Sequence, residues 1–139
     1  MANLKKRACV IASTILSLQI AFSAVTPKSK GDAIAGDWQG SSTCVVRPSG
    51  CKDEDAFYRF ARVAGKKNAY SLDGGKIVSG KVVSMGVMDC SYHPEHHSLE
   101  CALPNGARLE LLVSGDNIQG TMKLLDGTPW RNIKLTKVR

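Results

Sequence analysis

The chain lacks the sequence patterns that most known catalytic centres require. It contains no G-x-S-x-G motif, no H-E-x-x-H pair and no glycine-rich phosphate loop, and no serine or cysteine stands in a recognised motif with a base. Asp89 and Glu100 are the carboxylates that could still converge across neighbouring strands. Because nothing else in the chain supports general acid or base chemistry, we expect a protein that is not an enzyme and that needs no cofactor.

A strong excess of one charge is also absent. Nineteen basic and 12 acidic residues give a formal net charge of +7, but three of the basic residues lie in the N-terminal segment described next. Without that segment the excess is 16 minus 12, or +4. No basic stripe alternates with aromatic residues, so we expect no nucleic-acid partner. Lysine clusters such as Lys66 with Lys67 are interpreted as solvated faces.

Apart from one run near the N-terminus, no long apolar stretch occurs. The first 24 residues have the order of a secretory signal: a cationic start at residues 5–7, an apolar run over 8–22, and small residues after it. The run is too short and too often interrupted by polar residues for a membrane span, which needs about 20 apolar residues. We expect cleavage near Ser23 or Ala24, a periplasmic or secreted location, and no stable membrane anchor.

The remaining chain has the length of one domain. We assign residues 1–24 to the signal peptide, residues 25–34 to a flexible N-terminal arm that is polar and contains proline, and residues 35–139 to the folded domain. A domain of this size can build one core and benefits from covalent cross-links. No internal repeat divides it, and we expect a monomer.

Cysteine usage indicates two structural disulfides. Cleavage of the signal removes Cys9 and leaves four cysteines, which allow three connectivities. Cys90 and Cys101 occupy mirror positions of one predicted β-hairpin, while Cys44 and Cys51 flank a short turn, so we favour these two pairs. No C-x-x-C spacing occurs, and we therefore interpret the cysteines as structural and not as a redox or metal-thiolate site. Disulfides agree with maturation in an oxidising compartment.

Glycine-bearing turns separate short apolar runs from Gly36 onward, which indicates antiparallel strands and leaves almost no room for a helix. Earlier strands are expected at 37–46 and 55–63, followed by a short piece near Tyr70 that leads through Gly74 and Gly75 into 76–83. A meander is expected over roughly residues 83–138. Seven or eight short strands favour an all-β, small antiparallel up-and-down barrel, with a strongly curled sandwich as the alternative.

The register of the meander can be derived from its turns. Pairing Cys90 with Cys101 places Tyr92 opposite Leu99, and the turn at Asp126-Gly127 sets Ile133 beside Gly120. The consecutive strands then agree on one inward face. Its members that could line an apolar ligand cavity are Met88, Tyr92, Leu99, Leu111, Met122 and Ile133, with Met85 as the alternative to Met88.

One inward position in the last strand is charged. Arg131 shares its parity with Ile133 and is paired by register with Met122, so its guanidinium faces the core side near a barrel end. Because an unpaired buried charge is costly, a partner is required. We expect the ring of Trp38, at the start of the first strand, to accept this cation and so to close the barrel.

These residues resemble the lipocalin (calycin) signature. Gly36-Asp37-Trp38 on the first strand and Arg131 on the last are similar to the family's glycine-x-tryptophan motif, which packs under a C-terminal arginine. The chain departs from the family in being shorter and in lacking the threonine-aspartate-tyrosine motif and the C-terminal helix. It also resembles small bacterial lipocalin-shaped inhibitors of secreted proteases, and its segments Cys51-Lys52-Asp53-Glu54 and Asp126-Gly127-Thr128 are similar to those of certain secreted bacterial proteins. The resemblance implies a barrel that acts by binding.

One histidine cluster could hold a metal. His93, His96 and His97, together with Glu95, have a spacing that offers two or three imidazoles to zinc or copper. A usable site also needs fixed geometry and supporting hydrogen bonds, which an exposed hairpin loop does not supply. We interpret the cluster as a hydrophilic turn and expect no metal. The acidic segment 51–55 is interpreted as a charged loop, because it lacks the alternating spacing of a calcium loop.

Two binding functions remain open. The first is a carrier of a small apolar ligand in the barrel interior, against which an eight-stranded barrel can be filled by its own side chains. The second is a protein-binding module, such as an inhibitor of an extracellular protease or other hydrolase. Trp130 favours the second, because its parity directs it outward. A neighbouring loop or the N-terminal arm could equally cover this indole.

Overall fold

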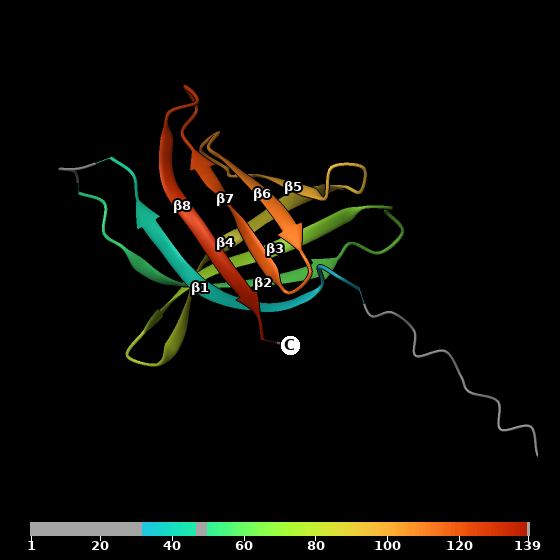
Figure 1. Cartoon of the computed structure of the whole chain (residues 1–139), viewed down its shortest axis with the longest axis horizontal. Helices are drawn as coiled ribbons and strands as arrows, with labels where there is room; N and C mark the ends of the chain where they lie inside the picture. The colour runs from blue at the N-terminus through green and yellow to red at the C-terminus, as the bar shows by residue number, and fades with distance from the viewer. Residues whose placement is uncertain (1–31, 47–49, 139) are drawn as a thin grey trace, which may run out of the picture.

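The molecule is a closed antiparallel β-barrel. A computed structural model describes residues 32–46 and 50–138, and within these residues it contains eight strands and no helix. Each strand pairs with the next in the chain, and the first and last strands pair with each other (Figure 1). The strands are β1 (Gly36–Cys44), β2 (Glu54–Arg62), β3 (Ala69–Val78), β4 (Lys81–His93), β5 (Ser98–Ala102), β6 (Arg108–Ser114), β7 (Asn117–Lys123) and β8 (Pro129–Lys137).

The register predicted for the second half of the chain is confirmed. Cys90 lies opposite Cys101, and Ile133 lies opposite Gly120. In β6 the side chains alternate between buried and exposed, which places every second residue inside the barrel. The all-β up-and-down barrel follows from this repeated alternation, and its closure leaves neither β1 nor β8 as a free sheet edge.

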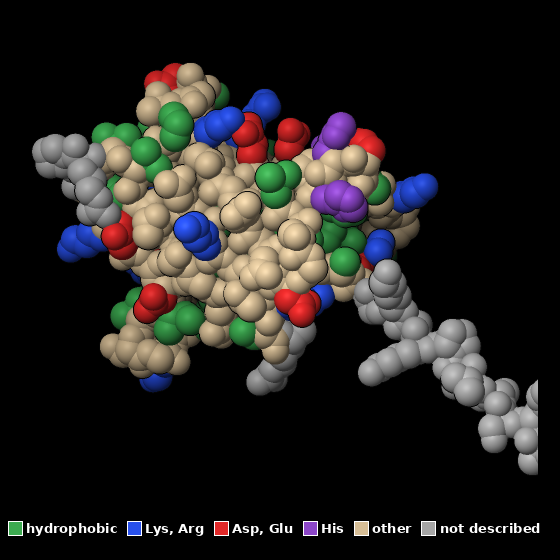
Figure 2. All heavy atoms as spheres, in the orientation of Figure 1, with side chains coloured by type: hydrophobic (Ala, Val, Ile, Leu, Met, Phe, Trp, Pro, Cys, Tyr) green, Lys and Arg blue, Asp and Glu red, His purple; other side chains and the backbone are tan. Residues whose placement is uncertain are grey.

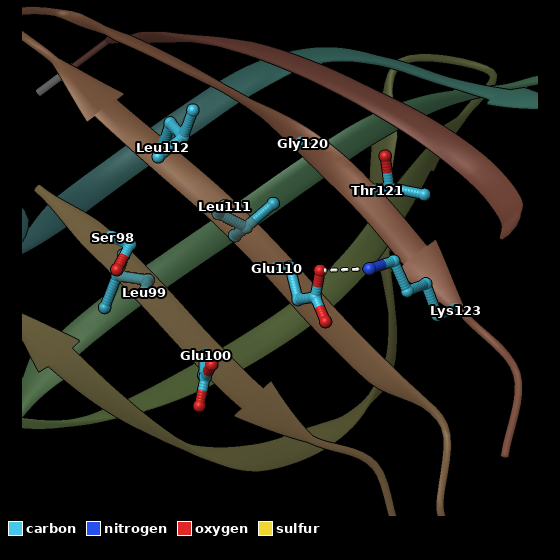
Figure 3. Close-up of a pocket in the computed structure, with 9 residues that line it drawn as sticks. All are labelled: Ser98, Leu99, Glu100, Glu110, Leu111, Leu112, Gly120, Thr121 and Lys123. Carbon is cyan, nitrogen blue, oxygen red and sulfur yellow. Dashed lines mark hydrogen bonds and ion pairs between the residues drawn. The ribbon is translucent and has the colours of Figure 1, made fainter. Parts of the chain in front are cut away.

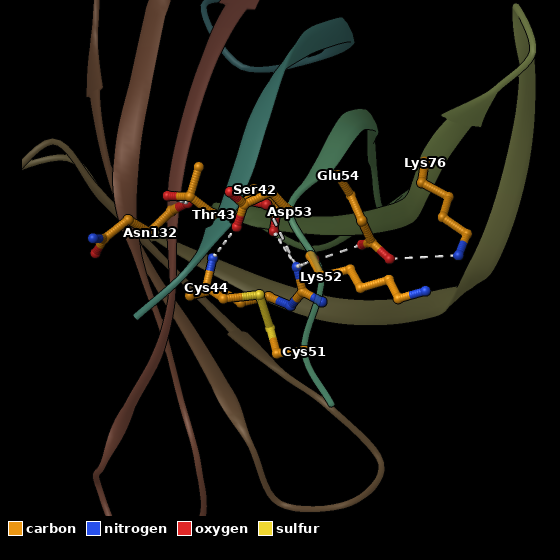
Figure 4. Close-up of a disulfide and its surroundings, with 10 residues drawn as sticks. Ser42, Thr43, Cys44, Cys51, Lys52, Asp53, Glu54, Lys76 and Asn132 are labelled. Carbon is orange, nitrogen blue, oxygen red and sulfur yellow. Dashed lines mark hydrogen bonds and ion pairs between the residues drawn. A yellow bond between two sulfur atoms is a disulfide. The ribbon is translucent and has the colours of Figure 1, made fainter. Parts of the chain in front are cut away.

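Both predicted disulfides are present. Cys90 and Cys101 join β4 to β5 within the barrel wall, whereas Cys44 and Cys51 join the end of β1 to the segment that precedes β2. Asp53 accepts a hydrogen bond from the backbone N–H of Cys44 at 2.8 Å, next to the second disulfide (Figure 4). These cross-links are consistent with an oxidising extracellular or periplasmic environment.

Two glycines in the wall allow it to curl tightly. A Cβ atom on Gly40 would lie 1.9 Å from the carbonyl oxygen of Lys134, and one on Gly120 would lie 2.0 Å from that of Glu110. No side chain fits at such distances, so the neighbouring backbones approach closely only because these positions lack a Cβ. The close approach narrows the barrel around its core.

The prediction for residues 70–83 is wrong in one respect. Gly74 and Gly75 lie inside β3, and the turn that separates β3 from β4 is formed by Ser79 and Gly80, both with positive φ (49° and 75°). Positive φ at both central residues suits a two-residue hairpin turn. The pairing of β3 with β4 shifts between Gly74 and Gly75, which marks a β-bulge. The two adjacent glycines therefore mark a β-bulge within the strand, whereas the sequence predicted a turn there.

Beyond the bulge, β3 and β4 form a projecting hairpin. Pairing of β2 with β3 ends at Lys76, and pairing of β4 with β5 begins at Asp89. We call residues 77–88 the β3–β4 arm; it is the yellow-green hairpin at the lower left of Figure 1. The arm extends away from the barrel wall, so most of its side chains are not covered by other strands.

The up-and-down order gives the barrel two different ends. The connections β1–β2, β3–β4, β5–β6 and β7–β8 lie at one end, which we call the arm end. The other three connections lie at the opposite end together with residues 32–35 and the C-terminal end of β8, and we call it the terminal end (Figure 1).

Candidate functional site

The six residues predicted to line a ligand cavity all belong to the barrel interior. Leu99, Leu111 and Ile133 are at most 1% exposed, while Met88, Tyr92 and Met122 are partly buried against the same cluster. The cluster also contains large side chains from the other strands, including Trp38, Phe60, Leu72, Leu109 and Ile118. These side chains pack together as one core. Their inward orientation follows the predicted alternation, and the binding of a ligand among them stays a prediction.

Several hollows of the described surface open outward. One, with a volume of about 410 Å³, crosses the outer faces of β5, β6 and β7 (Figure 3). Its rim carries Ser98, Glu100 and Leu112, and Glu110 forms an ion pair with Lys123 beside it. A small apolar ligand prefers an enclosed, mainly apolar pocket. This open and charged hollow does not have that character.

At the terminal end, the segment before β1 seals the barrel. Ile34 is 1% exposed and belongs to the core, although residues 32–34 were assigned to the flexible arm from sequence. The Asp32 carboxylate accepts hydrogen bonds from the N–H groups of Ile34 and Ala35, at 2.9 and 3.0 Å. Trp38 is fully buried, and its indole N–H donates to the carbonyl of Ile34 at 2.9 Å. Residues 25–31 of the predicted arm lie outside the described residues.

The predicted closure of the barrel by Trp38 and Arg131 is wrong. The cation over the Trp38 ring is Lys137, whose Nζ atom lies 5.4 Å from the ring centre. Trp38 pairs with Lys137 and Cys44 pairs with Arg131, so the two predicted partners lie at opposite ends of the β1–β8 ladder. Antiparallel pairing has this consequence, because the start of one strand meets the end of the other.

Arg131 instead closes the arm end. Its Nη1 atom donates to the Lys52 carbonyl at 3.0 Å and to Ser42 Oγ at 3.2 Å, and it lies 3.6 Å from Glu54 Oε2. The Arg131 side chain is 14% exposed, so the inward charge that the sequence indicated is real and is compensated by these oxygens. Glu54 also pairs with Lys76 at 3.4 Å (Figure 4). The acidic segment 51–55 therefore has a structural role.

Two inward tyrosines hold their protons strongly. Burial raises the pKa of Tyr58 to about 12, with a further increase from Glu54 and an opposing effect of Arg131. Burial likewise raises the pKa of Tyr70 to about 12, helped by the hydrogen bond that its hydroxyl donates to Asp32. Both phenols are neutral at physiological pH, so neither serves there as a base.

The Asp32 carboxylate is the polar centre of the terminal end. Burial alone would raise its pKa, but hydrogen bonds from Ala35, Ile34, Tyr70 and Arg62 outweigh that effect and lower it overall. The carboxylate is consequently ionised at neutral pH. It holds the plugging segment in place through backbone N–H groups, much as a capping residue does.

At the arm end, apolar side chains are exposed instead of buried. Eight of the ten exposed large hydrophobic side chains in the described chain lie at the arm end, on the arm or on the β1–β2 and β7–β8 connections; Leu112 and Val138 are the other two. Figure 2 shows apolar side chains gathered on the left and lower left, opposite the histidines. The eight residues are Val45, Val46, Val78, Val82, Val83, Met85, Val87 and Leu125.

Sequence reasoning missed this apolar surface. Met85 was considered as an inward residue, yet it is 57% exposed. The available signal was the composition of residues 82–87, where apolar side chains occur at both parities and not at every second position. A strand that is apolar on both faces is either buried on both faces within its own domain or exposed and able to contact another molecule.

The remaining candidate residues lie on the outer surface. His93 lies 3.8 Å from carboxylate oxygens of both Glu95 and Glu100. No group of three His, Cys, Asp or Glu residues in the described ranges is arranged to hold a metal ion. Asp89 and Glu100 are exposed on the β4–β5 wall. Trp130, predicted to point outward, is half-buried.

The chain has no match among family models, curated proteins or solved structures. Within the part of the chain that the structure describes, no helix is long and apolar enough to cross a membrane. The positions of the side chains therefore carry the functional inference. Of the surfaces above, the apolar arm end is the feature that the packing of the barrel does not account for.

Proposed function

We propose that the protein is a periplasmic or secreted, non-enzymatic module that binds another protein through its arm end, as an inhibitor of an extracellular hydrolase does. One observation carries the proposal: five large apolar side chains of the β3–β4 arm are 44–63% exposed. Soluble proteins rarely expose contiguous apolar surface unless it contacts something. The five residues are Val78, Val82, Val83, Met85 and Val87.

The shape of this surface favours a protein partner over a small ligand. Small apolar molecules bind in concave pockets that cover most of their surface. The arm is convex and projects from the barrel, so it fits into a cleft and does not itself form one (Figure 1). Methionine and aliphatic side chains at the centre of a contact are typical of protein interfaces.

The composition of the arm indicates which kind of surface on the partner would be complementary to it. Lys81 follows the turn at the tip and is the only charged residue within 77–88. A complementary cleft is therefore apolar along its walls and carries a carboxylate where the tip of the arm enters. The substrate cleft of an extracellular hydrolase has this concave form. The resemblance to lipocalin-like inhibitors supports the same class of partner.

Affinity capture from the native extracellular or periplasmic fraction tests the proposal. The double variant Met85→Asp/Val87→Asp introduces two charges on the arm, whereas Leu112→Asp introduces one on an outer face that is similarly exposed, at 52%. We expect the wild type and Leu112→Asp to retain the same hydrolase and the arm variant to lose it by at least about tenfold in affinity. The purified wild-type protein should also lower the turnover of that hydrolase.

Two results would contradict this function. A hydrolase that binds the arm variant as tightly as the wild type would place the contact elsewhere. Native mass spectrometry that finds a lipid or another small molecule retained by the protein, with no captured protein, would favour the carrier of a small apolar ligand. Thermal unfolding of each variant controls for loss of the fold.

A further inference from the structure

The arm has a free strand edge. β4 extends over Lys81–His93, but its pairing with β5 covers only Asp89 to His93. Residues 81–88 pair with β3 on one side, and on the other side the described chain places no strand against them. The barrel is closed, yet this one part of its wall extends past the neighbouring strand.

Backbone groups on this edge point away from β3. The Tyr92 N–H donates to the carbonyl of Asn68, which lies on the β3 side, at 2.8 Å. Because backbone groups alternate in direction along a strand, Cys90 and Met88 face β3 as well, and Val87 faces the opposite side. Beyond Asp89 that side has no partner strand in the described residues. Such N–H and C=O groups form a template for another strand.

The edge has few of the features that protect exposed edges. Natural proteins place proline, several charges, a β-bulge or a covering element there, and of these this edge carries the bulge. Residues 81–88 contain no proline and a single charge, Lys81, at one end. The bulge opposite Gly74 and Gly75 bends the hairpin, and the arm projects into open space (Figure 1). A second molecule can therefore approach without meeting the barrel first.

We infer that this edge pairs with the same edge of a second copy of the chain. A twofold axis brings two identical strands together antiparallel, and the contact is then self-complementary. Antiparallel pairing puts the two Lys81 side chains at opposite ends, so like charges do not meet. Residues 82–87 are uncharged, and their apolar side chains then lie against apolar side chains. The two arms form a four-stranded sheet between the barrels.

A second copy fits this edge because it brings the same uncharged, apolar strand, which is complementary to itself when the two strands run antiparallel. A partner strand with charges along its length would leave them without counter-charges on residues 82–87. The inference does not rest on the proposed function, because pairing uses backbone groups of the edge, whereas docking uses the side-chain faces. Pairing of two arms would enlarge those faces.

Sedimentation and hydrogen exchange of the exported chain test the inference together. The contact is small, so we expect monomer at about 1 μM and dimer at about 200 μM. At the higher concentration the amide of Val87 and the amides of the edge around it should exchange at least about tenfold more slowly. Amides near His96, at the terminal end, should not change.

A variant pair separates edge pairing from other association. Val87→Lys places a charge on the free edge, whereas Val46→Lys places one on an exposed loop residue of the same barrel end. We expect Val87→Lys to be monomeric at both concentrations and Val46→Lys to dimerise like the wild type. A wild type that stays monomeric at about 200 μM would overturn the inference, whether or not a hydrolase is captured. A dimer with unchanged exchange on the edge would also overturn it.

Discussion

The barrel buries the apolar residues at one of its ends and exposes those at the other. At the terminal end, Trp38 and Ile34 are buried under a segment that is fixed by Asp32 and Lys137. At the arm end, valines and a methionine project into solvent on a hairpin that no other strand of the described residues covers. The first arrangement stabilises the fold. The second contributes little to the stability of the isolated chain, which is why we assign it to binding.

The largest expected difference between the ends is in unfolding free energy. Trp38→Ala removes a fully buried indole and should lower the stability by about 3–5 kcal/mol. Val82→Ala on the arm removes atoms from a side chain that is 49% exposed and should change it by no more than about 0.5 kcal/mol. Urea denaturation of both variants measures the contrast. Similar losses would show that the arm is part of the folding core.

A smaller loss is expected from the polar closure of the arm end. Arg131→Ala leaves Ser42, the Lys52 carbonyl and Glu54 without their shared donor, although Glu54 keeps Lys76. Partly buried hydrogen bonds to a charged group predict a loss of about 1–3 kcal/mol. Arg108→Ala, on the exposed face of β6, is the control and should be nearly neutral. Equal effects of the two variants would contradict the assigned role of Arg131.

At the terminal end, the ionised Asp32 carboxylate should stabilise the plug by a pH-dependent amount. Its pKa is lowered in the folded state, so this stability is present above the ordinary value of 3.8 and is lost as the pH falls through the lowered pKa. Asp32→Asn should lower the stability by about 1 kcal/mol at pH 7. The difference from the wild type should shrink towards pH 2–3. A difference that is constant with pH would contradict the role of the charge.

The smallest expected effect is the contribution of the buried tyrosines to the pH dependence of stability, which appears only above neutral pH. The pKa values of Tyr58 and Tyr70 are raised to about 12, so each phenol stabilises the fold fully below pH 10 and loses that contribution as the pH rises towards 12. Absorbance titration near 295 nm should show two of the three tyrosines ionising near pH 12. Stability should fall between pH 10 and 12. Ionisation of Tyr58 and Tyr70 near pH 10 would show that these two rings are not buried.

The sequence predicted the second half of the fold more accurately than the ends. Turn residues such as Asp126-Gly127 set the register locally, and each strand then constrained the next, so the position of Ile133 beside Gly120 was confirmed. The cation over Trp38 could not be identified in the same way. Both Arg131 and Lys137 share the inward parity of β8, and only the antiparallel register of β1 with β8 decides between them.

The arm was missed for a different physical reason. Gly74 and Gly75 were placed where the hairpin connection was expected, but a bulge uses glycine as readily as a turn does. The exposure of Met85 and Val87 depends on the length of β5, which stops pairing at Asp89. Strand lengths are set by tertiary packing and are not encoded in the local pattern of β4 itself.

Site-specific photo-crosslinking in the native compartment tests the central claim most directly. A photoreactive side chain at position 85 samples the arm, one at position 112 samples the outer wall, and one at position 66 samples the terminal end; all three positions are exposed. We predict that position 85 alone gives a discrete adduct with another protein, separate in mass from any adduct between two copies of the chain. Adducts from positions 66 or 112 without one from position 85 would contradict the account.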